Sequence, residues 1–191
     1  MRYFISDNHF FHKNILGFGQ RDQFKTVEEM HTYMITAWNK TVSFKDIVYV
    51  VGDFSFGNYE DTKEILQQLK GRKILIRGNH DGLNTYEYIN MGFYDVRDEM
   101  YIKLNKERIL LKHYPYHKPF KQFINRLLGR KEYQRNYQIF FPVDKGLWHI
   151  NGHYHGGPLV KGKEINVSCE TLNYVPISEV KIQELITGAN K

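Results

Sequence analysis

Cysteine is almost missing from this sequence: Cys169 is the only one among 191 residues. A single thiol excludes an internal disulfide, a dithiol redox centre and a metal site made of several thiolates. We expect Cys169 itself to be a small buried residue in a strand. If the chain binds a metal, the ligands must be carboxylates, amides and imidazoles.

Long hydrophobic runs are missing as well. No apolar stretch approaches the roughly 18 residues of a membrane-spanning helix, and the amino-terminal residues lack the basic start and apolar stretch of a signal peptide. We therefore predict a cytoplasmic protein without a membrane partner. Internal repeats and low-complexity segments are also absent, and the length favours a single domain over residues 1–191.

What the chain does have is a local excess of positive charge. Its net charge is +6, yet residues 118–135 alone contain six basic residues and one acidic residue, so the rest is close to balance. Aromatic residues are interleaved with these charges. The segment is either a lid that offers cations to phosphates, or an amphipathic helix packed on the core with its charges in water. We favour a composite of the two, a packed helix with some of its charge facing the cleft. The candidate substrate-binding residues in it are Lys121, Arg126 and Arg130.

Strands and helices alternate in the first half of the sequence. Helical spacing of apolar residues predicts helices over 27–38 and 60–70. Apolar runs that read as strands precede, separate and follow these helices, at residues 3–6, 47–51 and 73–77. This order is typical of a parallel sheet, whose carboxyl ends gather the polar residues that follow each strand.

The second half has a different pattern. Short strand-like runs predict a second, more antiparallel sheet, followed by a closing helix. The expected strands are residues 93–97, 100–104, 108–113, 147–151 and 164–168, and the expected helix is 177–186. Residues 114–146 have no clear place on this core.

Five polar motifs follow these predicted strands. In chain order they are Asp7-Asn8-His9, Gly52-Asp53, Gly78-Asn79-His80-Asp81, His113, and Gly152-His153-Tyr154-His155. Asp7 and His9 are two residues apart, as are His153 and His155. On extended segments each pair would point to one side and could chelate an ion.

In content and order these motifs resemble the calcineurin-like metallophosphoesterase superfamily, and the opening Ser6-to-His12 run is similar to that of small bacterial and phage members. The resemblance implies an α/β fold with two mixed β-sheets sandwiched between helices. It also implies binuclear metal-dependent cleavage of phosphate monoesters or diesters by a hydroxide held between the metals. Phe11 and Lys112 stand where many relatives carry smaller residues, and neither change removes a ligand.

The resemblance also implies a role for each motif. Asp7, His9 and His155 would bind the first of two divalent ions. Asn79, His113 and His153 would bind the second, with Asp53 bridging the pair. Mn²⁺ is favoured, and Fe²⁺, Zn²⁺ or Ni²⁺ would also suit these ligands.

Three further residues have expected roles beside the metals. His80 is the candidate for a general-acid or electrostatic role, since beside so much positive charge a neutral imidazole is better suited to guiding or protonating the leaving oxygen than to binding another metal. Asp81 is expected to orient that imidazole through a hydrogen bond. His12 either contacts the substrate phosphate or is a surface histidine.

The expected substrate is a phosphodiester of the nucleotide or oligonucleotide type, because the basic aromatic segment suits such a ligand. Two alternatives are open at this point: a small nuclease of the same superfamily, and a non-catalytic metal-binding scaffold that interacts with another protein. The sequence leaves the oligomeric state open.

Overall fold

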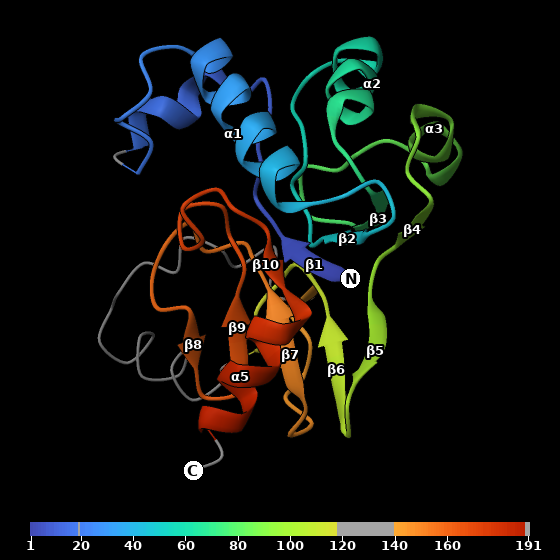
Figure 1. Cartoon of the computed structure of the whole chain (residues 1–191), viewed down its shortest axis with the longest axis vertical. Helices are drawn as coiled ribbons and strands as arrows, with labels where there is room; N and C mark the ends of the chain where they lie inside the picture. Colours follow the sequence, from blue (N-terminus) through green and yellow to red (C-terminus); the bar gives the residue numbers. More distant parts are fainter. Residues whose placement is uncertain (19, 118–139, 190–191) are drawn as a thin grey trace.

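Two five-stranded β-sheets pack against each other in the computed structural model, which describes residues 1–18, 20–117 and 140–189 (Figure 1). The strand order is β10-β1-β2-β3-β4 in the first sheet and β5-β6-β7-β9-β8 in the second. Each sheet contains parallel and antiparallel pairs. The predicted α/β sandwich of two mixed sheets is therefore confirmed.

The first sheet has a parallel centre with helical connections. Its strands are β1 (Arg2–Ile5), β2 (Ile47–Val50), β3 (Arg72–Ile76), β4 (Asp95–Arg97) and β10 (Ile177–Ser178). The connecting helices are η1 (Lys13–Phe18), α1 (Val27–Thr41), α2 (Tyr59–Gln68) and α3 (Thr85–Met91). Because β1, β2 and β3 are parallel neighbours, their carboxyl ends lie at one edge.

Side chains of β2 and the residue after it divide between two hydrophobic cores. Val48 and Val50 pack with α1, α2 and α3, whereas Tyr49 and Val51 face the second sheet. Successive strand residues point to opposite faces, so this run is apolar on both sides, as a covered parallel strand must be. The sheet is thereby held between a helical layer and the second sheet.

The second sheet completes the sandwich. Its strands are β5 (Met100–Leu104), β6 (Glu107–Leu111), β7 (Trp148–Asn151), β8 (Val160–Lys161) and β9 (Glu164–Asn166), and α5 (Glu179–Ala189) follows β10. Strands β6, β7 and β9 are parallel neighbours, so this sheet also has an edge where strand ends meet. Cys169 is fully buried, as expected, although it follows β9 rather than lying within a strand.

Several elements differ from the sequence prediction. Residues 93–97 were expected in the second sheet, but β4 pairs parallel with β3 in the first sheet, because α3 supplies the crossover connection that a parallel pair needs. The segment predicted as a helix over 177–186 begins as strand β10, which pairs antiparallel with β1, and the helix starts at Glu179. Pairing with β10 gives hydrogen-bond partners to the backbone at the free edge of β1, and it buries Ile177 in the core between the sheets. Helix α3 and strand β8 were not predicted.

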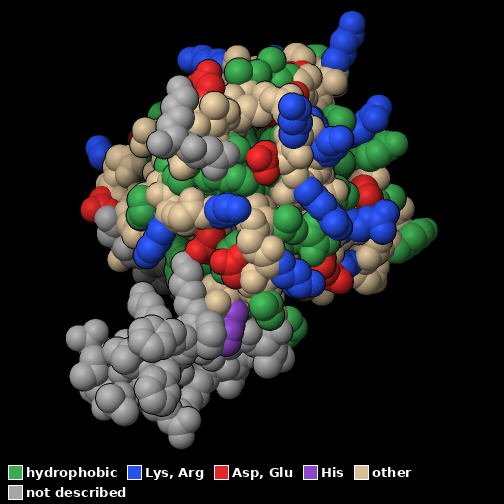
Figure 2. All heavy atoms as spheres, turned by 90° about the horizontal axis from the view of Figure 1, so that it is seen from below, with side chains coloured by type: hydrophobic (Ala, Val, Ile, Leu, Met, Phe, Trp, Pro, Cys, Tyr) green, Lys and Arg blue, Asp and Glu red, His purple; other side chains and the backbone are tan. Residues whose placement is uncertain are grey.

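The expectations for residues 118–135 fall outside the described part of the chain, which omits residues 118–139. The roles of Lys121, Arg126 and Arg130 therefore stay predictions, as do the lid and helix interpretations. On the described surface in Figure 2, basic and acidic side chains are interspersed. Within the described ranges, no helix is both long and apolar enough to cross a membrane.

Candidate metal centre

The strand ends of both sheets bring the predicted ligands together. Asp7 and Asp53 follow β1 and β2, and His113 follows β6. Two sets of side chains offer ligand atoms that lie within 4.8 Å of one another: Asp7 with His9 and His155, and Asp7 with Asp53 and His113. Residues from distant parts of the sequence thus converge on one buried carboxylate, Asp7.

The backbone at these residues is unusual. Asp7, His9, Asp53 and His153 all have positive φ angles, between 51° and 71°. Residues other than glycine adopt this left-handed region at a cost of order 1–3 kcal/mol, and such residues cluster at functional sites. The prediction of extended segments at Asp7, His9 and His153 is therefore wrong, and turns aim these side chains instead. Asp7 and His9 do offer ligand atoms to one centre, as predicted.

Two glycines permit the close approach of the loops. A Cβ atom on Gly52, whose φ is 91°, would clash with the ring of His113, and one on Gly152 would clash with the side chains of Ser6 and Asp7. Glycine is therefore required at both positions for the two sheets to present their side chains to a common centre.

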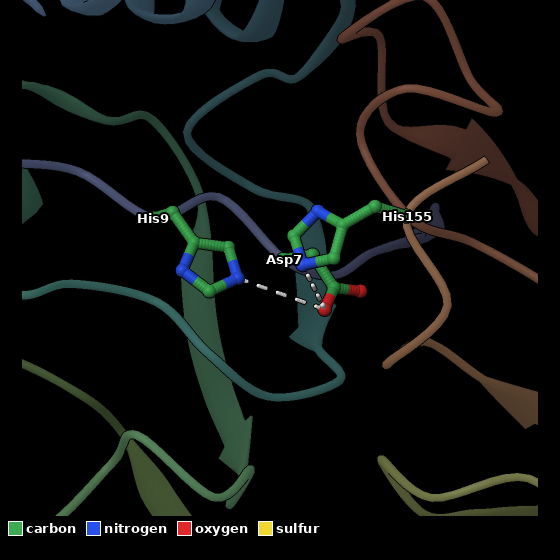
Figure 3. A group of neighbouring side chains, drawn as sticks. All are labelled: Asp7, His9 and His155. Atoms are coloured by element: carbon green, nitrogen blue, oxygen red, sulfur yellow. Dashed lines mark ion pairs between the residues drawn. The ribbon is translucent and has the colours of Figure 1, made fainter. Parts of the chain in front are cut away.

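Asp7, His9 and His155 form what we call the first ligand group (Figure 3). The Nε2 atoms of His9 and His155 lie 3.8 and 3.7 Å from Oδ1 of Asp7. The hydroxyl of Ser6 donates a 2.6 Å hydrogen bond to Oδ2. Neither ring nitrogen of His9 has a hydrogen-bond partner among the described residues, although both are buried. Such orphaned imidazole nitrogens beside a carboxylate suit a bound cation.

An ionic network braces this first ligand group. Nδ1 of His155 lies 2.8 Å from Oε1 of Glu170, and the guanidinium of Arg21 donates to the same oxygen at 2.8 Å. Arg21 is fully buried and also donates to the backbone oxygens of Asp7 at 2.6 Å and Asn8 at 2.8 Å. One side chain thus fixes both the loop that carries Asp7 and the carboxylate that orients His155.

His113, His153 and Asn79 form the second ligand group. Nδ1 of His113 lies 2.9 Å from the carbonyl oxygen of Val51, which can only accept, so the Nδ1 proton is fixed and Nε2 faces the site. Oδ1 of Asn79 lies 3.2 Å from Nε2 of His113 and 3.1 Å from Nδ1 of His153. Nε2 of His153 is buried without a hydrogen-bond partner in the described structure.

Asp53 lies between the two groups. Its Oδ2 atom is 3.7 Å from Nε2 of His9 in the first group and 3.4 Å from Nε2 of His113 in the second. A single carboxylate oxygen is therefore close to both groups.

The electrostatics of the centre favour anionic carboxylates. Burial favours the protonated acid, yet the imidazoles of His9 and His113 hold the pKa of Asp7 well below its usual value. Burial also disfavours the imidazolium of His113, but the charges of Asp53 and Asp7 raise its pKa to about 9. Burial, helped by the nearby His113, lowers the pKa of His153 to about 4. A metal cation could therefore displace the proton from His113.

His80 and His12 lie next to the ligand groups. The backbone N–H of His80 donates to Oδ1 of Asp53 at 2.9 Å, and its half-exposed ring has Nε2 4.0 Å from Oδ2. Burial lowers the pKa of His80, and burial with the nearby His9 lowers that of His12 to about 4. The ring of Phe56 packs against both, with centroid distances of 4.5 Å to His80 and 4.1 Å to His12.

Asp81 has contacts other than those expected. Its oxygens accept hydrogen bonds from the backbone N–H groups of Asp53, Gly78 and Phe54, at 2.7, 2.8 and 3.0 Å. Burial and the charge of Asp53 raise its pKa. The expected hydrogen bond to the His80 ring is not among these contacts; the buried carboxylate instead fixes the loops that carry Asp53 and Asn79.

A family model described as calcineurin-like phosphoesterase matches residues 3–175. The chain belongs to this family. It is 33% identical to the uncharacterized protein MJ1445 of Methanocaldococcus jannaschii, in a match that covers 96% of this chain and 90% of that one. It is 36% identical to the gene 66 protein of Mycobacterium phage L5 over 83 residues, 42% of this chain and 39% of that one.

A solved structure is also similar to this phosphoesterase. The protein of unknown function AQ665 from Aquifex aeolicus shares 32% identity and a TM-score of 0.70, with 97% of this chain and 98% of that one covered. This agreement extends the similarity to the fold, and the family match makes the chain a phosphoesterase hydrolase that acts on phosphate esters. The family binds divalent metals, and the carboxylate and imidazole clusters described above fit such ions.

Sequence reasoning missed two functional parts of the centre, Arg21 with Glu170 and the ring of Phe56. Glu170 follows strand β9 by a few residues, and Arg21 lies in the connection between η1 and α1. Neither belongs to a motif with a recognisable spacing. Only the convergence of distant loops makes them partners of the site.

Proposed function

We propose that this phosphoesterase hydrolyses phosphodiesters, preferably of nucleotide type, with two divalent ions bound between the sheets. The observation that carries the proposal is the position of Asp53, one oxygen of which lies within 3.7 Å of an imidazole nitrogen of each ligand group. A carboxylate in this position is suited to bridging two ions. When bound, the ions would supply an activated water and neutralise charge on the phosphate.

We assign the ions to the two ligand groups. Asp7, His9 and His155 would hold the first ion, and Asn79, His113 and His153 the second. The orphaned nitrogens of His9 and His153 support this assignment, as does the fixed Nδ1 proton of His113. Mn²⁺ is the favoured ion, with Fe²⁺, Zn²⁺ and Ni²⁺ as alternatives.

His80 is the proposed general acid. As water displaces the leaving oxygen at phosphorus, the electron pair of the broken bond passes to that oxygen, which takes its proton from the imidazolium form of His80 and leaves a neutral imidazole. Asp81 would act on catalysis only indirectly, by positioning the loops of Asp53 and Asn79. His12 is proposed to contact the phosphate from the other side of Phe56, and Lys121, Arg126 and Arg130 keep their proposed role as substrate contacts.

The test is hydrolysis of bis(p-nitrophenyl) phosphate by metal-stripped protein after Mn²⁺ is added back. We expect Mn²⁺ to restore turnover, and Asp53→Asn to lower it roughly 10³-fold, because several kcal/mol of transition-state stabilisation depend on the metals. Glu184→Gln is the control, since Glu184 is exposed and makes its ion pair with Lys181 within helix α5. Turnover that ignores Mn²⁺ or survives Asp53→Asn would refute the proposal.

A further inference from the structure

A pocket of about 280 Å³ lies beside His80. We call it the His80 pocket; it is lined by Phe56, His80, Gly82, Leu83, Tyr88 and the hydroxyl-bearing pair Ser55 and Thr62. His80 belongs both to this pocket and to the surroundings of Asp53, whose Oδ2 lies 4.0 Å from its Nε2. The imidazole therefore separates the metal centre from the pocket.

The walls of the His80 pocket are aromatic and aliphatic. Phe56 is 38% exposed, and the centroid of its ring lies 4.5 Å from that of the His80 ring. Tyr88, in helix α3, is buried. The hydroxyls of Ser55 and Thr62 bond to each other at 2.8 Å. Among the described residues that line the pocket, none is Asp, Glu, Lys or Arg.

We propose that the His80 pocket receives the leaving alcohol of the substrate, and that this alcohol is uncharged and carries a single ring system, as a nucleoside or an aryl alcohol does. This inference rests on the proposed function, because it takes His80 as the residue beside the leaving oxygen. It adds the chemical class of the group that departs.

The lining decides the charge of this group. A phosphate or carboxylate placed there would lose part of its hydration, and no Lys or Arg lines the pocket to compensate for that loss. An aromatic ring would instead stack on Phe56 and bury apolar surface against Leu83. The hydroxyls of Ser55 and Thr62 could exchange their mutual bond for bonds to a sugar or ring nitrogen.

The volume decides the size of the group. Pockets for drug-sized ligands range from roughly 300 to 1,000 Å³. The His80 pocket, at about 280 Å³, lies just below this range. One ring system fits such a space, whereas the two bases of a dinucleotide would not both enter it.

Gly82 offers a way to fill the pocket without disturbing the fold. A Cβ atom built on Gly82 has no neighbour within 4 Å, and its φ is not in the left-handed region. Gly82→Leu should therefore place a side chain in the pocket without backbone strain. Gly188→Leu is the matched control, because a Cβ atom there is equally free and lies in α5, far from the centre in sequence and fold.

The binding experiment uses metal-stripped protein, so that it does not depend on hydrolysis. Saturation-transfer NMR would compare adenosine and benzyl alcohol with benzoate, which keeps the ring and adds a charge. We expect the two neutral ligands to bind and benzoate to bind at least about tenfold more weakly. Gly82→Leu should weaken the neutral ligands by about tenfold, and Gly188→Leu should leave them unchanged.

Two outcomes would overturn the inference: benzoate binding as well as benzyl alcohol, or neutral ligands binding equally well to Gly82→Leu. A second variant, Leu83→Ala, guards against misfolding of the first, since it removes an apolar wall and should also weaken adenosine. Failure of Mn²⁺-dependent hydrolysis, with neutral-ligand binding intact, would contradict the proposed function and leave the pocket assignment standing.

Discussion

The two ligand groups each present two imidazoles and one side-chain oxygen, from Asp7 in the first and Asn79 in the second, but they are held by different interactions. In the first group, His155 is oriented by the ion pair of Glu170 with the buried Arg21. In the second, His113 is oriented by the backbone carbonyl of Val51. Orienting His155 requires two further side chains that form a desolvated ion pair. Orienting His113 requires only a backbone carbonyl at the end of a strand. The first group should therefore be much easier to damage by substitution.

Arg21→Met should give the largest effect. It removes hydrogen bonds to Glu170 and to the backbone oxygens of Asp7 and Asn8, and it takes from the buried carboxylate of Glu170 its permanently charged partner, leaving His155. Breaking a buried ion pair typically destabilises a protein by about 3–5 kcal/mol. Thermal unfolding in the presence of EDTA would measure this loss of stability. Calorimetric titration with Mn²⁺ should show weaker binding at the first ligand group than at the second.

Arg2→Met is the control for this substitution. Arg2 also binds a glutamate, Glu179, at 2.7 Å, but the pair is partly exposed and lies away from the ligand groups. Its loss should cost about 1 kcal/mol or less and should not change Mn²⁺ binding. Equal losses in the two variants would contradict the idea of a special brace.

Glu170→Gln should have a smaller and more selective effect. The amide keeps the size of the side chain but loses the charge that pairs with Arg21 and holds His155. Loss of a residue that orients a metal ligand commonly lowers metal affinity or activity about 10- to 100-fold. Titration of Glu170→Gln with Mn²⁺ should show one ion bound with lowered affinity and one bound with wild-type affinity. Titration of Glu179→Gln should show wild-type affinity for both ions. An equal loss of affinity for both ions would contradict the idea that the two ligand groups are oriented by separate contacts.

The pH dependence of the metal-free protein should distinguish the groups further. The folded pKa of His113 is about 9, above its ordinary value, so its protonation stabilises the fold below pH 6.5, and that stabilisation is lost as the pH rises towards 9. The pKa of His155 is raised as well, despite its burial, by the hydrogen bond to Glu170 and the charge of Asp7. Thermal unfolding in EDTA should therefore show stability falling over this window.

His113→Asn should flatten that decline, and Mn²⁺ affinity of the wild-type protein should rise over the same range because the ion displaces the proton. The pKa values of His12 and His153 are lowered, so these two histidines change the stability only below pH 6.5 and do not affect the decline between pH 6.5 and 9. Stability that is constant or increasing between pH 6.5 and 9 would contradict the assignment.

Val51→Ala should have the smallest effect on metal binding. The substitution removes buried methyl groups, with a loss of about 1–3 kcal/mol in unfolding free energy, but it keeps the carbonyl that orients His113. Calorimetric titration should show both ions bound as in the wild type. A selective loss of the second ion would mean that the Val51 side chain, not its carbonyl, holds the histidine.

The sequence predicted the fold and the ligand candidates because both depend on local patterns. Apolar runs that stop at Asp7, Asp53 and Asn79 identify strand ends, and parallel neighbours bring such ends together whatever lies between them. The order of the motifs then led to the family. These inferences needed no information about contacts between distant segments.

The parts that sequence reasoning missed depend on such contacts. Arg21 and Glu170 are 149 residues apart and become partners only when the connection between η1 and α1 meets the loop after β9 near Asp7. The left-handed turns at Asp7 and His9 could not be inferred, since local propensity favours an extended strand there. Likewise, Ile177 fits a helical pattern until the free edge of β1 supplies a strand partner.

The most direct test of the account is anomalous scattering from Mn²⁺ in crystals of the protein. We predict two peaks about 3.5–4 Å apart, one at Asp7, His9 and His155 and one at Asn79, His113 and His153, with Asp53 in contact with both. One peak alone, or peaks at other side chains, would contradict the account.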